Sequence, residues 1–366
     1  MRLMLVIGAR PQIIKSAPVI HEALKRSEIE LQLIHTGQHY DYEMSRMLFG
    51  ELDLPDPLAN LGVGSGTHAY QTGKMLIELE KTIMDLGPDM VLVPGDTNST
   101  LAGALAAVKL HVPVAHLEAG ARSYDMQMPE EINRRLTDHC SSLLFASTRN
   151  CVEKLAGEGI QRRHIRLSGD TMYDAMLQHM KRADETEILK KLDLKREEYV
   201  VLTLHRPENV DAPEKLERII KALIVLKGLA IVFPVHPRTK KRLATVKLMR
   251  HKAAVEHIKL IEPVGYEDML RLTKNAKMVF TDSGGLQKEA FWLHTPCITL
   301  RDTTEWTETT DLGANILVGD NPQKIAEAAK EIIEDADVKA KLRRLKNPYG
   351  DGRASEKIIR YILKRR

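Results

Sequence analysis

Short apolar runs alternate along this chain with longer segments whose apolar positions recur at helical spacing. The runs at residues 2–7, 31–36, 90–93 and 113–117 in the first half, and 199–203, 230–235, 259–261 and 277–280 in the second, are predicted as strands. The segments between them, such as residues 12–26, 70–86, 101–110 and 214–227, are predicted as helices. Continuous apolar strands alternating with helices are typical of a parallel sheet covered on both faces. The pattern therefore predicts an α/β fold with two parallel-sheet domains of comparable size.

The break between the two series places a domain boundary near residues 169–171. A chain of 366 residues is long enough for two domains. We expect residues 1–170 to form an N-terminal domain and residues 171–350 a C-terminal domain. Residues 351–366 are expected to form an amphipathic basic helix that packs back on the N-terminal domain. The charged segment 181–198 is predicted as a solvated helical connector.

Composition narrows the functions that suit this fold. The 54 basic and 50 acidic residues nearly balance, giving a net charge of +4, and 4% of residues are aromatic. Such a surface does not suit nucleic acid, which needs a basic face or aromatic stacking platforms. Three cysteines without paired spacing predict a reducing compartment and no disulfide framework. We see no signal-peptide pattern, and the most apolar stretch, residues 222–235, is too short for a bilayer, so we expect a cytoplasmic protein without membrane contact.

One stretch of the second half combines a strand, a turn of small residues and a helix. The apolar run at residues 277–280 leads to Ser283, Gly284 and Gly285, and helical periodicity follows. Small residues let a ligand approach the backbone, and the free N–H groups at a helix N-terminus bind anions such as phosphate. Glu289, about one helical turn further on, is placed to accept hydrogen bonds from a ribose. An ordinary tight turn explains the same residues, and the local sequence leaves both interpretations open.

Polar residues recur just after the predicted strands, where open parallel sheets bind their ligands. In the first half these include the acids Asp96, Glu118 and Glu130. Asp96 is explained equally well as the cap of the next helix, and Glu130, after Pro129, is explained better as an acid in a first helical turn. Basic side chains suited to a diphosphate follow strands as well: Arg10, Lys15, His205, Arg206, His236 and Arg238.

Metal and cofactor chemistry has weak support. His116 and Glu118 are a lone pair without a further ligand at useful spacing, and no paired-cysteine or His-Glu-x-x-His motif occurs. The glycine-rich residues 62–66 do not follow a convincing strand, which disfavours a dinucleotide site. The Gly-x-Ser-x-Gly elbow of serine hydrolases is missing. We therefore expect neither a metal nor a cofactor.

Together these motifs resemble the non-hydrolysing UDP-N-acetylglucosamine 2-epimerase family. The resemblance runs in order through segments 8–15 (GARPQIIK), 36–41 (TGQHYD), 95–97 (GDT), 116–120 (HLEAG), 128–134 (MPEEINR), 205–209 (HRPEN), 281–287 (TDSGGLQ), 301–305 (RDTTE) and 349–352 (YGDG). It implies two Rossmann-like domains of the glycosyltransferase-B type, with the active site in the cleft between them, and a homodimer. The implied reaction, part of polysaccharide biosynthesis, interconverts UDP-N-acetylglucosamine and UDP-N-acetylmannosamine. It proceeds by elimination of UDP to 2-acetamidoglucal and re-addition of UDP, without metal or nicotinamide.

The resemblance also implies roles for individual residues. Asp96, Glu118 and Glu130 would be the acid–base group, and His205 would contact or protonate the diphosphate. The implied binding residues are Arg10, Lys15, Gln38, Arg206 and His236 at the phosphate or sugar, Ser283, Gly284 and Gly285 at the diphosphate, Glu289 at the ribose, and the loop from Val264 to Met269 at the uracil.

Several positions depart from the common bacterial pattern. Other members usually have Thr and Glu where this chain has Ala9 and Gln12, and an acid where it has Lys288. Many members have Arg where it has Trp306, and members with a second, allosteric substrate site have Arg where it has Tyr70. Tyr70 and the short loop 122–129 argue against a second, allosteric substrate site. Residues 123–126 and 304–306 also resemble epimerases of UDP-2,3-diacetamido-2,3-dideoxy-glucuronic acid, which is the alternative substrate. A glycosyltransferase of the same architecture is a second alternative.

Overall fold

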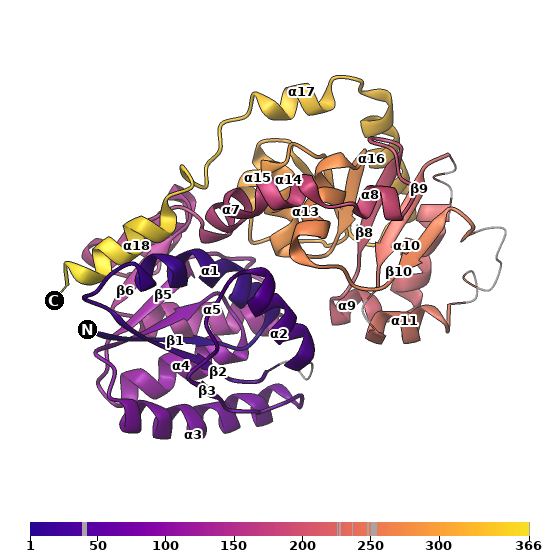
Figure 1. Ribbon diagram of the computed structural model, residues 1–366. Helices are drawn as coiled ribbons and strands as arrows, with labels where there is room; N and C mark the ends of the chain where they lie inside the picture. The colour runs from indigo at the N-terminus through magenta and orange to yellow at the C-terminus, as the bar shows by residue number, and fades with distance from the viewer. Residues whose placement is uncertain are drawn as a thin grey trace. The chain divides into compact units, whose positions relative to one another are not determined.

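The structure, a computed structural model, describes residues 1–38, 42–224, 226, 228–235, 237–246, 249 and 255–365. The chain forms two compact units, one made of residues 1–178 with 347–366 and the other of residues 179–346. Each unit has a parallel sheet with helices packed against it (Figure 1). The predicted fold class of two parallel-sheet α/β units is therefore confirmed.

The first unit is built on a sheet of seven strands within the described residues, in the order β3-β2-β1-β4-β5-β6-β7. The strands are β1 (Arg2–Ile7), β2 (Glu30–His35), β3 (Ala59–Asn60), β4 (Met90–Pro94), β5 (Val114–Ala119), β6 (Leu143–Ala146) and β7 (Ile165–Leu167). The chain runs outward from β1 to β3, returns to β4 and then continues to β7. The strand order thus switches direction between β1 and β4, and in open parallel sheets ligands bind at the carboxyl ends of the strands beside such a switch.

Helices connect these strands and cover the sheet. They are α1 (Arg10–Leu24), α2 (Tyr42–Glu51), α3 (His68–Leu86), α4 (Asn98–Lys109), α5 (Pro129–Cys140), α6 (Arg149–Gly157) and the short 3₁₀ helix η1 (Arg162–His164). After the last strand come α7 (Thr171–Glu185), whose residues from 179 on belong to the second unit, and, at the end of the chain, α18 (Ala354–Leu363). One apolar core lies between β1, β4, α3 and α4, with Val6, Val91 and Leu79 fully buried in it. The many alanines of α4 let this helix pack closely on the sheet.

The second unit repeats the arrangement with six strands among the residues described, in the order β10-β9-β8-β11-β12-β13. They are β8 (Tyr199–Thr203), β9 (Ala230–Pro234), β10 (Ile258–Ile261), β11 (Met278–Thr281), β12 (Cys297–Thr299) and β13 (Asn315–Leu317). The helices are α8 (Ile188–Lys191), α9 (Pro207–Val210), α10 (Pro213–Ile224), α11 (Pro237–Leu243), α13 (Tyr266–Asn275), α14 (Gly284–Trp292), α15 (Thr307–Asp311), α16 (Pro322–Glu334) and α17 (Val338–Arg343). Here the switch lies between β8 and β11.

The C-terminal segment belongs to the first unit because buried polar contacts hold it there. Asp174 of α7 accepts hydrogen bonds from the amides of Ala354 and Ser355 at 3.1 and 2.7 Å, which satisfies free N–H groups at the start of α18. Gly169 and Gly350, both in left-handed backbone, lie so close together that a Cβ on Gly350 would be 3.1 Å from the Gly169 Cα. α18 then packs against α1.

Candidate functional site

The predicted acids of the first unit lie at the carboxyl edge of its sheet, next to the switch point. Asp96 follows β4, Glu118 lies near the end of β5, and Glu130 is the second residue of α5. All three are half-buried. Of the predicted basic residues, Arg10 starts α1 and is half-buried, whereas Lys15 is buried in its second turn. One sheet edge therefore collects the predicted acids and bases of this unit.

Glu118 has an unusual backbone conformation, and its side chain is paired with a buried lysine. The Lys15 Nζ lies 2.9 Å from the Glu118 Oε2, and the two side chains are 7% and 10% exposed. Glu118 has a φ of +67°, and the pairing of β5 with β6 shifts register between Leu117 and Ala119. Positive φ is costly for a residue with a side chain, and such strain concentrates at functional sites. The irregularity supports a functional role for Glu118 beyond that of an ordinary strand residue.

Gly95 makes the space that the Lys15 ammonium occupies. Its φ is +68°, and a Cβ at this position would lie 2.9 Å from the Lys15 Nζ. The Gly95 carbonyl accepts a hydrogen bond from the His116 Nε2 at 2.7 Å. The residue before Asp96 is thus fixed from two sides, and only glycine leaves the ammonium in place.

Asp96 is paired with an arginine that sequence reasoning did not single out. The Arg134 Nη1 lies 2.7 Å from the Asp96 Oδ2, and its Nη2 lies 2.9 Å from the Oε2 of Glu131, which is fully buried. Burial alone would raise the pKa of Glu131, but the Ser123 amide and the Arg134 charge outweigh it and hold that pKa below its usual value. The spacing of Glu131 and Arg134 on one helix face was a signal available in the sequence.

A buried polar layer supports the acids from behind. The His116 Nδ1 lies 2.7 Å from the Asp138 Oδ1, and the Arg122 Nη2 lies 2.6 Å from the Asp138 Oδ2. Burial of Asp138 favours the neutral carboxyl, but the charges and hydrogen bonds of His116 and Arg122 lower its pKa overall. No local signal could pair His116 with Asp138, since Asp138 lies 22 residues further along the chain.

Two glutamines tie the loops of this edge together. The Gln38 Oε1 accepts hydrogen bonds from the amide and hydroxyl of Ser99, at 3.1 and 2.6 Å. The Gln12 Oε1 accepts from the Gly8 amide at 2.9 Å, while its Nε2 donates to the Pro94 carbonyl at 2.9 Å. A glutamate at position 12 has no N–H to donate to Pro94. The structure gives Gln38 a structural role in holding Ser99, and its contact with the substrate stays a prediction.

In the second unit, the predicted diphosphate turn lies at the carboxyl end of β11, next to the switch point. Ser283 caps α14, and its Oγ accepts a hydrogen bond from the Leu286 amide at 3.5 Å. A Cβ on Gly284 would lie 2.3 Å from the Glu305 Oε1 and 3.1 Å from the Trp306 Nε1. Close packing against residues 305 and 306 therefore requires glycine here, and the amides of residues 284–286 form the first turn of α14.

Asp282 organises the neighbouring loop after β8. It is fully buried, pairs with the His205 Nδ1 at 2.9 Å, and accepts from the Arg206 amide at 3.0 Å. Burial would raise the pKa of Asp282, but the His205 charge and these hydrogen bonds lower it below its usual value. The His205 side chain is 54% exposed, so it is fixed on one ring nitrogen while remaining accessible.

Arg206 is anchored beside the same turn. Its Nε donates to the Asp282 carbonyl at 2.9 Å, and its Nη2 lies 3.9 Å from the Glu305 Oε1. The Arg301 Nη2 lies 2.9 Å from the Glu305 Oε2. Sequence reasoning named Arg206 but missed Arg301 and Glu305 as neighbours of the turn, because the loop after β12 is brought there only by the pairing of β12 with β11.

The other predicted binding residues of this unit have less distinctive surroundings. Glu289 is 5% exposed within α14. Val264 and Met269 are partly buried and pack against the core cluster that contains Leu286. His236 lies outside the described residues. The ribose and uracil contacts remain predictions.

Within the described part of the chain, no group of three or more His, Cys, Asp or Glu side chains could hold a metal ion. Burial raises the pKa of the Cys297 thiol to about 12, which does not suit a nucleophile. No helix among the described residues is long and apolar enough to cross a membrane.

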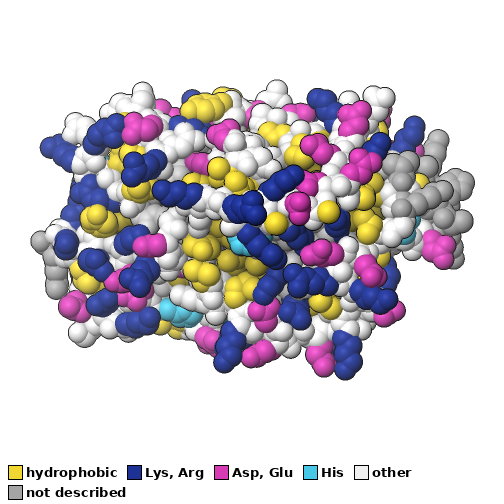
Figure 2. Space-filling view, turned by 90° about the horizontal axis from the view of Figure 1, so that it is seen from above, with side chains coloured by type: hydrophobic (Ala, Val, Ile, Leu, Met, Phe, Trp, Pro, Cys, Tyr) yellow, Lys and Arg dark blue, Asp and Glu magenta, His cyan; other side chains and the backbone are white. Residues whose placement is uncertain are grey.

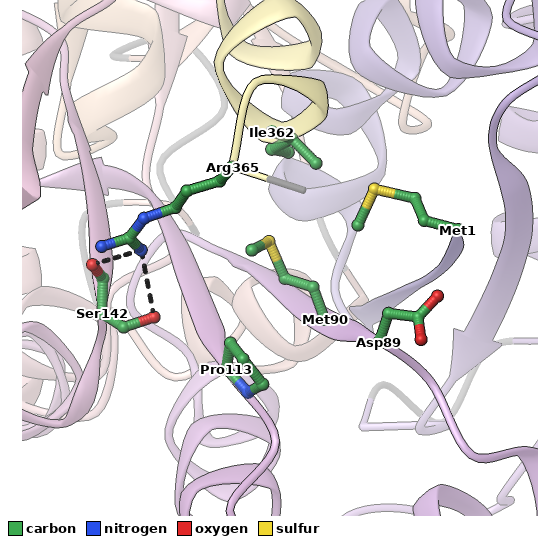
Figure 3. A pocket seen from close by; sticks show the side chains of 7 residues that line it. All are labelled: Met1, Asp89, Met90, Pro113, Ser142, Ile362 and Arg365. Atoms are coloured by element: carbon green, nitrogen blue, oxygen red, sulfur yellow. Dashed lines mark hydrogen bonds between the residues drawn. The ribbon is translucent and has the colours of Figure 1, made fainter.

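A pocket of about 560 Å³ lies at the amino edge of the first sheet, opposite the candidate acids (Figure 3). Its lining residues are Met1, Asp89, Met90, Pro113, Ser142, Ile362 and Arg365. The Arg365 side chain extends along the pocket, and its Nη1 donates a hydrogen bond to the Ser142 carbonyl at 2.6 Å. Because ligands of parallel sheets bind at the carboxyl ends of strands, we do not place the candidate site in this pocket.

Known proteins of one family resemble this chain over nearly its full length. Residues 21–363 match the sequence profile of the family described as UDP-N-acetylglucosamine 2-epimerase. The chain is 49% identical to the UDP-N-acetylglucosamine 2-epimerase of Methanocaldococcus jannaschii, with 99% of each chain covered. It is 43% identical to the UDP-2,3-diacetamido-2,3-dideoxy-D-glucuronate 2-epimerase of Pseudomonas aeruginosa, with 100% of each covered.

Solved structures give the same result. The crystal structure of the M. jannaschii UDP-GlcNAc 2-epimerase in complex with UDP-GlcNAc and UDP matches with a TM-score of 0.92 at 48% identity, covering 100% of both chains. The glycosyltransferase SnogD from Streptomyces nogalater, at 15% identity and a TM-score of 0.60 over 100% and 99% of the chains, shares the fold alone. The predicted likeness to the glycosyltransferase-B architecture and the predicted family resemblance are both confirmed.

Proposed function

Because the chain belongs to the UDP-N-acetylglucosamine 2-epimerase family, we propose that it is an isomerase that interconverts UDP-N-acetylglucosamine and UDP-N-acetylmannosamine. The observation that carries the proposal is the set of charged side chains and free helix ends at the switch points of the two sheets. One holds carboxylates paired with cations, Glu118 with Lys15 and Asp96 with Arg134. The other holds a helix N-terminus beside Arg206 and His205. Acids suit transfer of a sugar proton, and the helix turn with its cations suits a diphosphate.

The chemistry explains why both groups are needed. The hydrogen on sugar carbon 2 is not next to a carbonyl, so it is removed as UDP leaves and positive charge builds at carbon 1. A carboxylate takes the proton, the carbon 1–oxygen bond breaks, and its electron pair departs on the diphosphate while a double bond forms between carbons 1 and 2. The diphosphate oxygen then attacks carbon 1, and an acid returns a proton to the other face of carbon 2. Stabilising the departing diphosphate is the larger electrostatic task.

We assign the proton transfers to Asp96, Glu118 and Glu130. The strained backbone of Glu118 and its pairing with Lys15 support this role, and the Arg134 contact supports a fixed position for Asp96. We assign the diphosphate to residues 283–285 with Arg206 and His205. Arg10, Gln38 and His236 at the sugar or phosphate, Glu289 at the ribose and the loop 264–269 at the uracil complete the proposed site.

A second candidate substrate is UDP-2,3-diacetamido-2,3-dideoxy-glucuronic acid. It is favoured by the 43% identity, over the full length, to a Pseudomonas aeruginosa enzyme that is named for this substrate. Both substrates undergo the same inversion at carbon 2, so the proposed roles are shared. A glycosyltransferase has support from the fold alone.

Deuterium incorporation tests the proposal directly. The full chain is incubated with UDP-N-acetylglucosamine alone in deuterated water, and carbon 2 is followed by NMR, with the diacetamido uronate run in parallel. We expect deuterium at carbon 2 and a manno product from one of the two substrates. Asp96→Asn and Glu118→Gln should abolish exchange while UDP binding persists. The assignment fails if neither substrate exchanges, and the choice of base fails if both variants exchange at the parent rate.

We also propose that the protein is a homodimer that acts in the cytoplasm in polysaccharide biosynthesis, as the family resemblance implies. Lys and Arg are interspersed with Asp and Glu on the face shown in Figure 2. Such a mixed surface fits a protein that works on small nucleotide sugars in solution. Sedimentation velocity on the full chain tests the dimer, and a monomer at micromolar concentration would contradict it.

A further inference from the structure

A lysine is fully buried behind the proposed diphosphate turn. Lys288 is 0% exposed, and its Nζ lies 3.7 Å from the ring centroid of Trp306 and 5.9 Å from that of Trp292. Lysine is rarely buried because removal of an ammonium from water is costly. An ammonium over the face of an indole recovers part of that cost as a cation–π interaction. The fold thus keeps a positive charge inside this unit, close to α14.

The position of Lys288 on α14 directs its charge toward the first turn. It follows Gly284 by four residues, so the two share one helix face, and the Cα–Cβ bonds of a helix tilt toward its N-terminus. The ring that receives the ammonium also reaches that turn, because a Cβ on Gly284 would lie 3.1 Å from the Trp306 Nε1. The indole of Trp306 therefore lies close both to the Lys288 ammonium and to the first turn of α14.

Hydrogen bonds fix the backbone of Trp306. The Trp306 amide donates to the Thr304 Oγ1 at 3.1 Å, and the Thr304 hydroxyl donates to the Gln287 Oε1 at 2.6 Å. The Trp306 carbonyl accepts from the Thr309 hydroxyl at 2.9 Å. The neighbouring Glu305 carboxylate is paired with Arg301 at 2.9 Å. The backbone of Trp306 is thus anchored at both its amide and its carbonyl, which fixes the point from which the indole extends toward Lys288.

We propose that Lys288 is a positioning residue that strengthens binding of the UDP diphosphate through the field of its buried ammonium, without touching the nucleotide. This inference rests on the proposed function, since it takes the diphosphate to lie at residues 283–285. A fixed charge in a low-dielectric interior acts over several ångströms with little screening by salt. Its effect grows with the charge of the ligand, so it favours UDP over uridine.

Calorimetric titration of the full chain with UDP and with uridine isolates this effect. Lys288→Met removes the charge at similar volume, and we expect UDP affinity to fall by about tenfold or more while uridine affinity changes by less than about twofold. Lys288→Arg should retain the parental ratio of UDP to uridine affinity. Lys330→Met is the matched control, because Lys330 is a 73% exposed lysine of α16 in the same unit, and we expect an unchanged ratio.

The results distinguish this role from a merely structural one. The proposal would be overturned if Lys288→Met left the ratio of UDP to uridine affinity unchanged, whether both affinities fell equally or neither fell. If Lys288→Met does not fold, as judged by circular dichroism, Lys288→Gln replaces it with the same expected change in ratio. Failure of the unaltered chain to bind UDP would refute the proposed function itself, which is a separate outcome.

Discussion

A single methyl group at Gly95 should move the ammonium that holds the candidate base. In Gly95→Ala the new Cβ would lie 2.9 Å from the Lys15 Nζ, whereas ordinary contacts begin at 3.4 Å. Lys15 must therefore shift away from the turn, and its 2.9 Å ion pair with Glu118 lengthens or rotates. At an effective dielectric near 20, lengthening such a pair by about 0.5–1 Å removes roughly 1 kcal/mol of attraction.

Loss of alignment adds to this electrostatic term. A displacement of about 1 Å in a catalytic arrangement can cost roughly 100-fold in rate. We therefore expect Gly95→Ala to lower the rate of deuterium incorporation at carbon 2 by about 10- to 100-fold. UDP affinity should fall by a smaller factor than the exchange rate, because the proposed diphosphate turn at residues 283–285 belongs to the other unit.

Gly87→Ala separates this effect from backbone strain. Gly87 also has a left-handed backbone, with a φ of +53°, and a Cβ there would lie 3.2 Å from the Nη1 of Arg2, the end of a flexible side chain. Both substitutions should lower stability by roughly 1–2 kcal/mol, measured by urea unfolding, because left-handed backbone disfavours a Cβ. Only Gly95→Ala should slow exchange. Equal exchange rates in the two variants would refute the reasoning.

Two further predictions concern stability. Arg134→Met leaves the buried Glu131 carboxylate without its closest cation, so it should lower the free energy of unfolding in urea by about 3–5 kcal/mol. The control is Arg135→Met: the Arg135 side chain is 37% exposed and contacts the same carboxylate at 3.2 Å, so its loss should cost under about 1 kcal/mol. Equal losses in the two variants would contradict this prediction. Asp138 and Asp282 have pKa values below their usual range, so their stabilisation is present above the unfolded-state pKa near 4 and is lost as pH falls through the folded-state value. Guanidinium unfolding between pH 6 and 3 should show this loss, and Asp138→Asn should flatten it; an unchanged slope would rule out Asp138 as a contributor.

The sequence predicted the sheet but not the contacts that fix its polar edge. Apolar runs and helical spacing are local signals, so β1, β4, β5, β8 and β11 were all expected close to where they lie. The pairing of Lys15 with Glu118 joins residues 103 positions apart, and that of Arg134 with Asp96 joins residues 38 apart. Periodicity says nothing about such pairs, because they depend on which strands become neighbours.

Short or mixed elements were also beyond local signals. The charge of segment 181–198 predicts one solvated helical connector, but α7 ends at Glu185, α8 covers only residues 188–191, and Ile188 is buried. Its apolar residues Leu189, Leu192 and Leu194 pack against the core of the second unit. The high charge of this segment hides, in the sequence, a set of leucines that pack against the core in the folded chain.

Three of the five departures from the common family pattern, Gln12, Lys288 and Trp306, take part in local contacts that bear on substrate choice. Gln12 uses its amide to reach Pro94, and Lys288 uses the indole that occupies position 306. Lys288 and Trp306 lie in the unit to which we assign UDP, the part that both candidate substrates share. Replacing Lys288 should therefore change kcat/KM for the two substrates by the same factor. A change in their ratio would mean that this pair also senses the hexose, since only the hexose differs between them.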